Sequence, residues 1–201
     1  EDKTFAFSNI AALLNYGATF AISYLMSIYL QVIMGYTSQT AGLILIAQPL
    51  MQALFSPMMG KLSDRIPPYK LATAGMCFCV VGLGLFAMVG LETSIIFIVA
   101  ALMLSGFGFA LFSSPNTNAV MSCVQPKNYS VANSILSTMR TVGQSSSMAV
   151  VTIVVGMTMG SQALTAAEPD TLVHTMHIIF SIFIALCLVG VVLSMQRRKI
   201  Q

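Results

Sequence analysis

Polar side chains recur along stretches of this sequence that are otherwise apolar, and such groups could contact a ligand. One set lies between residues 5 and 34, where hydroxyl and amide groups return at helical spacing. Its members are Asn15, Tyr16, Thr19, Ser23, Tyr24, Ser27 and Gln31. A second set follows the apolar run that begins near residue 95, and consists of Ser113, Ser114, Asn116 and Asn118. We interpret both as the polar wall of a substrate cavity; hydrogen bonding between neighbouring helices is the alternative.

Two further segments carry polar faces. Gln48, Gln52 and Ser56 stand four residues apart, which places them on one side of a helix. The segment 130–159 is the most polar, and its broad polar face consists of Asn133, Ser137, Arg140, Thr141, Gln144 and Ser147. Small residues such as Gly143 and Ser146 let another helix approach this face closely. We expect a tight helix interface here; for Arg140, a side chain extending to the cytoplasmic boundary is the alternative.

Several kinds of chemistry have no residues to support them. The sequence has no H-E-x-x-H motif, and no nucleophile–base set or metal cluster lies in its apolar stretches. Cys77 and Cys79 form C-x-C, which is not a zinc spacing, and we expect all four cysteines to be small apolar residues of helices. We therefore expect no enzyme activity, no metal and no cofactor.

Composition defines the environment that must position these residues. Hydrophobic residues make up 57% of the 201 residues and charged residues only 7%, whereas soluble domains carry about 25% charged residues. The net charge of +3 comes from scattered Lys and Arg residues without a basic stripe, so we expect no nucleic-acid partner. A water-soluble fold of this size could not bury so much apolar surface. We therefore predict a membrane protein with the lipid bilayer as its solvent.

The apolar stretches predict an all-α membrane protein with six transmembrane helices, because a spanning helix needs about 20 mostly apolar residues. The predicted spans are about 5–34, 40–60, 70–89, 95–123, 130–159 and 172–195, in one domain over 1–201. The connections between them are short or polar. Because the sequence starts with Glu1 rather than Met, we expect a fragment or an excised domain.

The basic residues predict the orientation of these spans. Eight of the nine Lys and Arg residues fall on the side that receives both chain ends and the 60–70 and 123–130 connections. They are Lys3, Lys61, Arg65, Lys70, Lys127, Arg197, Arg198 and Lys199. The opposite side holds Glu92, Glu168 and Asp170 and no basic residue. The positive-inside rule places both ends of the segment in the cytoplasm, and we expect a multi-pass protein of the cell membrane.

The connection between the second and third spans carries a motif. Gly60, Leu62, Asp64 and Arg65 match the loop motif G-x-L-x-D-R-x-G-R-K, although Pro67, Pro68 and Tyr69 replace its later glycine and basic pair. The chain resembles the major facilitator superfamily at this motif. It is also similar to the carboxyl-terminal half of drug-efflux members at 29–35, at 104–109 with Ser114-Pro115, and at 132–136 with Arg140 and Gly143. The resemblance is closest to the fourteen-helix drug:proton antiporter branch.

This resemblance implies a six-helix half of two three-helix repeats, whose amino-terminal half is missing from the chain. It implies that spans one and four line a cavity for a small-molecule substrate, that spans two and five meet the missing half, and that spans three and six face lipid. Gln48, Gln52, Asn133, Arg140 and Gln144 then become candidates for packing between the halves. Asp64 and Arg65 become candidates for gating; a solvated loop charge is the alternative for Asp64.

The expected function is secondary active transport, with proton-coupled efflux of hydrophobic or drug-like molecules. No Asp or Glu lies inside a predicted span, so any titrating carboxylate for proton coupling belongs to the missing half. The alternative is a non-transporting membrane subunit or a channel-like protein, although no ring of charges or filter loop is visible.

Overall fold

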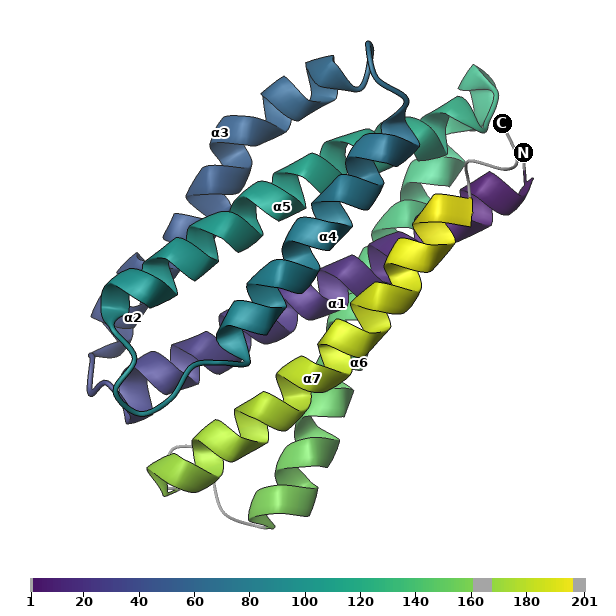
Figure 1. Ribbon diagram of the computed structural model, residues 1–201. Helices are drawn as coiled ribbons and strands as arrows, with labels where there is room; N and C mark the ends of the chain where they lie inside the picture. Colours follow the sequence, from purple (N-terminus) through teal and green to yellow (C-terminus); the bar gives the residue numbers. More distant parts are fainter. Residues whose placement is uncertain (1, 161–167, 197–201) are drawn as a thin grey trace.

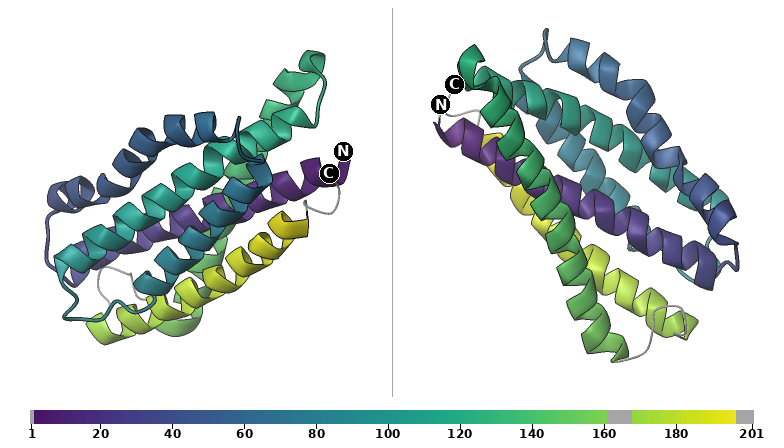
Figure 2. Two further views of the ribbon diagram at one scale, coloured as in Figure 1. Left: turned by 45° about the horizontal axis from the view of Figure 1, so that its top comes forward. Right: turned by 180° about the vertical axis from the view of Figure 1, so that it is seen from behind.

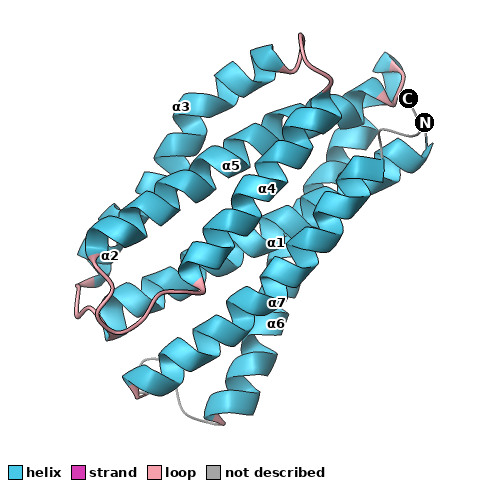
Figure 3. Cartoon of the chain, in the orientation of Figure 1, coloured by secondary structure: helices cyan, strands magenta, loops and turns pink. Residues whose placement is uncertain are grey.

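The computed structural model describes residues 2–160 and 168–196, and within them every regular element is a helix (Figures 1 and 3). The α-helices are α1 (Asp2–Val32), α2 (Ser38–Leu45), α3 (Ala47–Leu62), α4 (Pro68–Phe86), α5 (Ile95–Ser122), α6 (Tyr129–Met159) and α7 (Pro169–Gln196). With α2 and α3 taken as one span, six helices are long and apolar enough to cross a membrane, which confirms the predicted fold class. Most of the predicted connection before the last span, and the basic residues Arg197, Arg198 and Lys199, lie outside the described residues.

The second span is not one continuous helix. It begins at Ser38, where the Thr37 hydroxyl accepts a hydrogen bond from the Thr40 amide at 3.3 Å, and it breaks at Ile46. Pro49 explains the break, because it has no N–H to donate to Leu45 and its ring crowds that carbonyl. The sequence prediction of a single helix over 40–60 missed this break.

The third span is shorter than predicted, and the turn after the fourth span is partly ordered. α4 begins with Pro68 at its first turn, where the missing N–H costs nothing, and it ends at Phe86 rather than at Val89. A short 3₁₀ helix, η1 (Pro126–Asn128), precedes α6 in a segment that we predicted as an irregular turn.

The first three spans and the last three spans pack in the same pattern, with α1 equivalent to α5, α3 to α6 and α4 to α7. α1 packs on α6 and α7, and α5 packs on α3 and α4 in the same way. The equivalent helices α1 and α5 contact each other, and so do the equivalent helices α4 and α7. Two related groups of three helices therefore build one bundle.

Glycines permit the closest approach in each group. A Cβ placed on Gly143 of α6 would collide with the backbone carbonyl of Leu13 on α1, and one placed on Gly106 of α5 would collide with that of Gln48 on α3. Only glycine lets these backbones lie so near each other. These two close contacts are equivalent, because one joins α1 to α6 and the other joins α5 to α3.

The bundle has two different broad faces. α4 and α7 lie on one face (Figure 1), and from behind α1 runs between α6 and α3 (Figure 2). In their most apolar stretches 50% of α1 and 56% of α5 are buried, against 11% of the α2–α3 span and 28% of α6. The bundle thus encloses α1 and α5 and leaves α3 and α6 largely uncovered.

The start of α1, the end of α7, the α3–α4 connection and η1 lie at one end of the bundle (Figure 1). Lys3, Arg65 and Lys127 belong to these segments, and Lys61 and Lys70 lie next to the connection, in the last turn of α3 and the first turn of α4. The α4–α5 connection, which carries Glu92, lies at the opposite end together with the start of α7. These five basic residues therefore lie at one end, together with Asp2 and Asp64, whereas Glu92, Glu168 and Asp170 lie at the other end without a described Lys or Arg residue.

Candidate functional site

A small cavity of about 230 Å³ opens on the face where α1 lies between α3 and α6. Its lining comes from four helices: Tyr16, Thr19, Phe20 and Ser23 of α1, Gln52 of α3, Phe109 of α5 and Gln144 of α6. We call it the Tyr16 cavity. It combines aromatic rings, hydroxyls and side-chain amides, which is the mixture typical of a small-molecule site.

Tyr16 connects the parts of this cavity. Its hydroxyl lies 3.0 Å from the Ser113 hydroxyl, and its ring meets Phe109 edge-on at 4.8 Å between centroids. The guanidinium of Arg140 lies over the same ring, 4.9 Å from its centroid. A single aromatic side chain therefore joins α1, α5 and α6 at the cavity.

Arg140 is held inside the bundle beside this ring. Its Nη2 donates to the Thr117 hydroxyl at 3.1 Å, whereas its buried Nε has no hydrogen-bond partner among the described residues. The residue stands 11 positions after the first residue of α6, or about 16 Å along the helix. Arg140 forms no ion pair within the described chain, so an unneutralised cation lies next to the Tyr16 cavity.

The predicted polar set of α1 divides between four surroundings. Tyr16 and Thr19 line the cavity. Asn15 is completely buried inside the bundle. Gln31 donates to the Ser27 carbonyl at 3.0 Å and accepts from Ser38 at 2.7 Å, which fastens the end of α1 to α2. Tyr24 is half-buried against the main apolar core.

On α5, the predicted residues likewise have different neighbours. Ser113 reaches Tyr16, whereas Asn116 is buried and donates to the Ser8 carbonyl of α1 at 3.2 Å. Asn116 thus joins α5 to α1 from within, whereas both polar side-chain atoms of the buried Asn15 have no hydrogen-bond partner among the described residues, and neither residue lines the Tyr16 cavity. Asn116 therefore fits the alternative interpretation, in which a polar residue within a span forms a hydrogen bond to a neighbouring helix.

Of the candidates for packing between halves, Gln52 and Gln144 line the cavity, and Asn133 is exposed on α6. Gln48 is buried, and its Oε1 accepts from the Ser23 hydroxyl at 3.4 Å. The uncovered face of α6 also carries exposed hydroxyls: Ser130, Ser134, Ser137, Thr138, Thr141, Ser145 and Ser146.

The loop motif packs against the end of α5. Ser63 donates to the Gly60 carbonyl at 2.7 Å and accepts from the Asn118 side chain, and Gly60 lies directly beside Ser114. Asp64 and Arg65 are exposed and make no ion pair within the described chain. The motif therefore fixes its backbone through Ser63 and leaves both charges free.

The sequence analysis did not select Phe20 and Phe109, which line the Tyr16 cavity, or Thr117, which binds Arg140 beside it. Phe20 and Phe109 resemble ordinary lipid-facing or core residues when only their type is known. Thr117 could have been found, because it follows Ser113 by one helical turn and shares its face. Within residues 2–160 and 168–196, no three His, Cys, Asp or Glu side chains gather where a metal ion could be held.

These features define a class of protein: a multi-pass membrane protein of six spanning helices with a polar, aromatic cavity on one face. The family model described as Major Facilitator Superfamily matches residues 9–199. The chain belongs to this superfamily of membrane transporters.

Two of the curated relatives that it matches are named as transporters, and a third is named for multidrug resistance. The chain is 27% identical over 140 residues to the riboflavin transporter RibZ of Clostridioides difficile, which covers 70% of this chain and 31% of that protein. It is 30% identical over 133 residues to the multidrug resistance protein Stp of Mycobacterium tuberculosis, covering 66% of this chain and 25% of that protein. It is 30% identical over 125 residues to the uncharacterized transporter YebQ of Escherichia coli, covering 62% of this chain and 27% of that protein. The aligned segments therefore span less than a third of each relative.

Proposed function

We propose that this chain forms the carboxyl-terminal half of a secondary active transporter that exports hydrophobic or drug-like small molecules by proton-coupled antiport. One observation carries the proposal: the Tyr16 cavity opens on the face that is flanked by the two least buried spans, α2–α3 and α6. A second half seated on these spans would enclose the cavity. A substrate would then bind between the halves, near the membrane midplane.

The cavity residues support a substrate that is partly aromatic and carries hydrogen-bonding groups. Tyr16, Phe20 and Phe109 offer ring surfaces, and Gln52 and Gln144 offer amide donors and acceptors. Two matched relatives are named for riboflavin transport and for multidrug resistance, which agrees with a ligand of this kind.

The uncovered polar face of α6 supports the presence of a second half. Hydroxyl and amide groups facing lipid would lack hydrogen-bond partners, which is costly in hydrocarbon. The side chains of Asn133, Ser137 and Gln144 form no hydrogen bond with a described residue and gain partners if another helix covers them, whereas the Thr141 hydroxyl already donates to the Ser137 carbonyl at 3.1 Å. Their short side chains allow that helix to approach closely.

The charge distribution supports an orientation with both ends of the segment in the cytoplasm of a cell membrane. The described acidic residues are Asp2, Asp64, Glu92, Glu168 and Asp170, all at helix ends or in connections. A carboxylate that titrates during proton coupling would therefore come from the missing half.

A transport assay on the full-length protein tests this function. We expect vesicles that contain it to export a fluorescent lipophilic cation when a proton gradient is imposed. Arg140→Gln removes the cation beside Tyr16 and should slow export about tenfold, the effect of losing one charge-assisted hydrogen bond. Lys127→Gln removes an exposed charge far from the cavity and should leave export unchanged. Equal export with and without the gradient would contradict antiport.

A further inference from the structure

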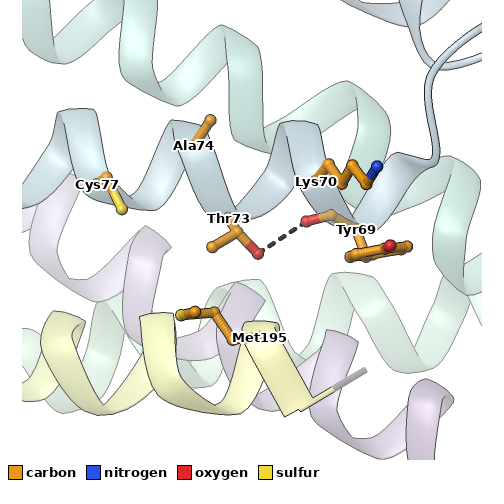
Figure 4. Close-up of a pocket in the computed structure, with 6 residues that line it drawn as sticks. All are labelled: Tyr69, Lys70, Thr73, Ala74, Cys77 and Met195. Carbon is orange, nitrogen blue, oxygen red and sulfur yellow. Dashed lines mark hydrogen bonds between the residues drawn. The ribbon is translucent and has the colours of Figure 1, made fainter. Parts of the chain in front are cut away.

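A second and larger cavity, of about 460 Å³, lies between the first turns of α4 and the last turn of α7. Its described lining residues are Tyr69, Lys70, Thr73, Ala74, Cys77 and Met195 (Figure 4). This α4–α7 cavity shares no residue with the Tyr16 cavity and lies between the helices of the other broad face. Its volume falls in the range of ligand sites, about 300–1,000 Å³.

The lining changes from charged to apolar along one side of α4. Lys70, Thr73, Ala74 and Cys77 follow the spacing i, i+3, i+4, i+7, which places them on one helix face over about 10 Å. Figure 4 shows Thr73 and Cys77 directed from α4 toward α7, where Met195 lies. The cavity therefore has a cationic end at the helix start and an apolar end one to two turns further into the bundle.

The polar groups of the lining differ in their availability. The Thr73 hydroxyl lies 2.7 Å from both the Tyr69 carbonyl and the Ser194 hydroxyl, so it closes the contact between α4 and α7. The side chain of Lys70 is exposed, and its ammonium group forms no hydrogen bond or ion pair with a described residue. Its ammonium group is free to bind an anion at the mouth of the cavity.

The surroundings match those of a membrane lipid. Near the cavity, both helices expose large apolar residues: Val81 of α4 and Leu188, Val189 and Val192 of α7. Lys61 in the last turn of α3 and Arg65 in the α3–α4 connection add positive charge nearby. In the orientation proposed above, this end meets the cytoplasmic leaflet, where anionic lipids attract basic residues close to the membrane surface.

We propose that the α4–α7 cavity binds one anionic phospholipid. Its phosphate pairs with the Lys70 ammonium, and one acyl chain lies against Ala74, Cys77 and Met195. The order of charge and apolar surface along α4 is the order of a phospholipid from headgroup to chain. This proposal rests on the proposed orientation and is independent of which substrate the protein carries.

Cys77 provides the readout, because its exposed thiol lies at the apolar end of the cavity. In a full-length protein whose other cysteines are replaced, Cys77 is labelled with an uncharged maleimide in lipid nanodiscs. We expect labelling to be several-fold slower when part of the phosphatidylcholine is replaced by phosphatidylglycerol. Lys70→Gln should raise the phosphatidylglycerol content needed for half-protection about fivefold, the effect of one lysine near an anionic surface.

Lys127→Gln is the matched control, because it removes the same charge from an exposed lysine of η1 outside the cavity. Its protection should equal that of the unmodified protein. Equal protection by phosphatidylcholine alone, or equal losses in Lys70→Gln and Lys127→Gln, would overturn the proposal. Protection by inorganic phosphate in detergent would identify a free-anion site and overturn the assignment to lipid. Nanodiscs record no transport and expose both sides, so these outcomes are separate from the tests of function and orientation.

Discussion

Tyr16 is the residue on which the candidate site depends most. Its ring is packed between the Phe109 ring and the Arg140 guanidinium, while its hydroxyl meets Ser113. The ring and the hydroxyl therefore have different roles. The ring positions the Arg140 guanidinium, and the hydroxyl joins α1 to α5. Two substitutions separate these contributions.

We expect Tyr16→Phe to lower the stability of the full-length protein by only ~0.6 kcal/mol, the average value of a hydrogen bond between membrane helices. Tyr16→Ala also removes the ring, with its aromatic and cation–π contacts, and should cost ~3 kcal/mol or more. Thermal unfolding in detergent measures both, and substrate binding should persist in Tyr16→Phe and be lost in Tyr16→Ala. Equal behaviour of the two variants would mean that the ring does not organise the site.

The residue scale also shows how far sequence can specify a site. The sequence predicted two adjoining polar stripes on α1, one with Tyr16 and one with Asn15 and Thr19, and Tyr16 and Thr19 both line the Tyr16 cavity. The same reasoning included Asn15, which is buried, because a rotation of about 100° per residue separates adjacent side chains while the sequence alone does not fix which side faces the core. Phe20 and Phe109 carry no polar signal, so only the packing of α1 against α5 reveals them.

At the scale of elements, Gly143 allows α6 to lie against α1. A Cβ at this position would meet the Leu13 backbone, which cannot move aside as a flexible side chain can. We therefore expect Gly143→Ala to push the helices apart and to destabilise the protein by ~1–3 kcal/mol. Thermal unfolding of the full-length protein in detergent measures this loss as a lower unfolding temperature.

Gly156→Ala supplies the control on the same helix, since nothing lies within 4 Å of a Cβ placed there. Helix propensity favours alanine over glycine by ~1 kcal/mol, so this variant should be as stable as the unmodified protein or more so. If both glycine variants behave alike, the close contact between α1 and α6 is not important for stability.

The elements themselves were largely predictable, and their interruptions were not. A run of about 20 apolar residues forms a spanning helix in a membrane, so hydropathy predicted the number and order of the six spans. The break at Ile46 follows from Pro49, which was present in the sequence but lies within a run apolar enough to be taken as one helix. The packing of α1 against α6 and of α5 against α3 depends on contacts between segments far apart in the sequence. A single sequence does not reveal these contacts.

At the scale of the whole molecule, the segregation of charge predicts sidedness. Single cysteines placed at Lys61 and Lys127 should react with an impermeant thiol reagent only from the cytoplasm, and one at Glu92 only from outside. Intact cells compared with permeabilised cells provide the measurement. Reaction of the Lys127 position in intact cells would contradict the six-span topology in this orientation.

Asp64 offers a test of gating. Its carboxylate is exposed and has no ion partner in the described chain, whereas the neighbouring Ser63 is fixed to α5. We expect Asp64→Asn to shift the balance between open and closed states by removing an attraction to the other half, worth ~0.3–1 kcal/mol at a helix start. Expression should be unchanged.

The measurement is the accessibility of a cysteine in the Tyr16 cavity, with Asp64→Glu as the variant that keeps the charge. Accessibility and transport that are both unaffected by Asp64→Asn would leave Asp64 as a solvated loop charge.

The central claim is that this chain supplies half of a transport pathway and that proton coupling lies in the other half. The most direct measurement compares the full-length protein with the 201-residue chain alone, each reconstituted in vesicles under an imposed proton gradient, by following export of a fluorescent lipophilic cation. We predict gradient-driven export by the full-length protein and none by the chain alone, whose polar α6 face would lack its partner. Gradient-driven export by the chain alone would contradict both parts of the claim.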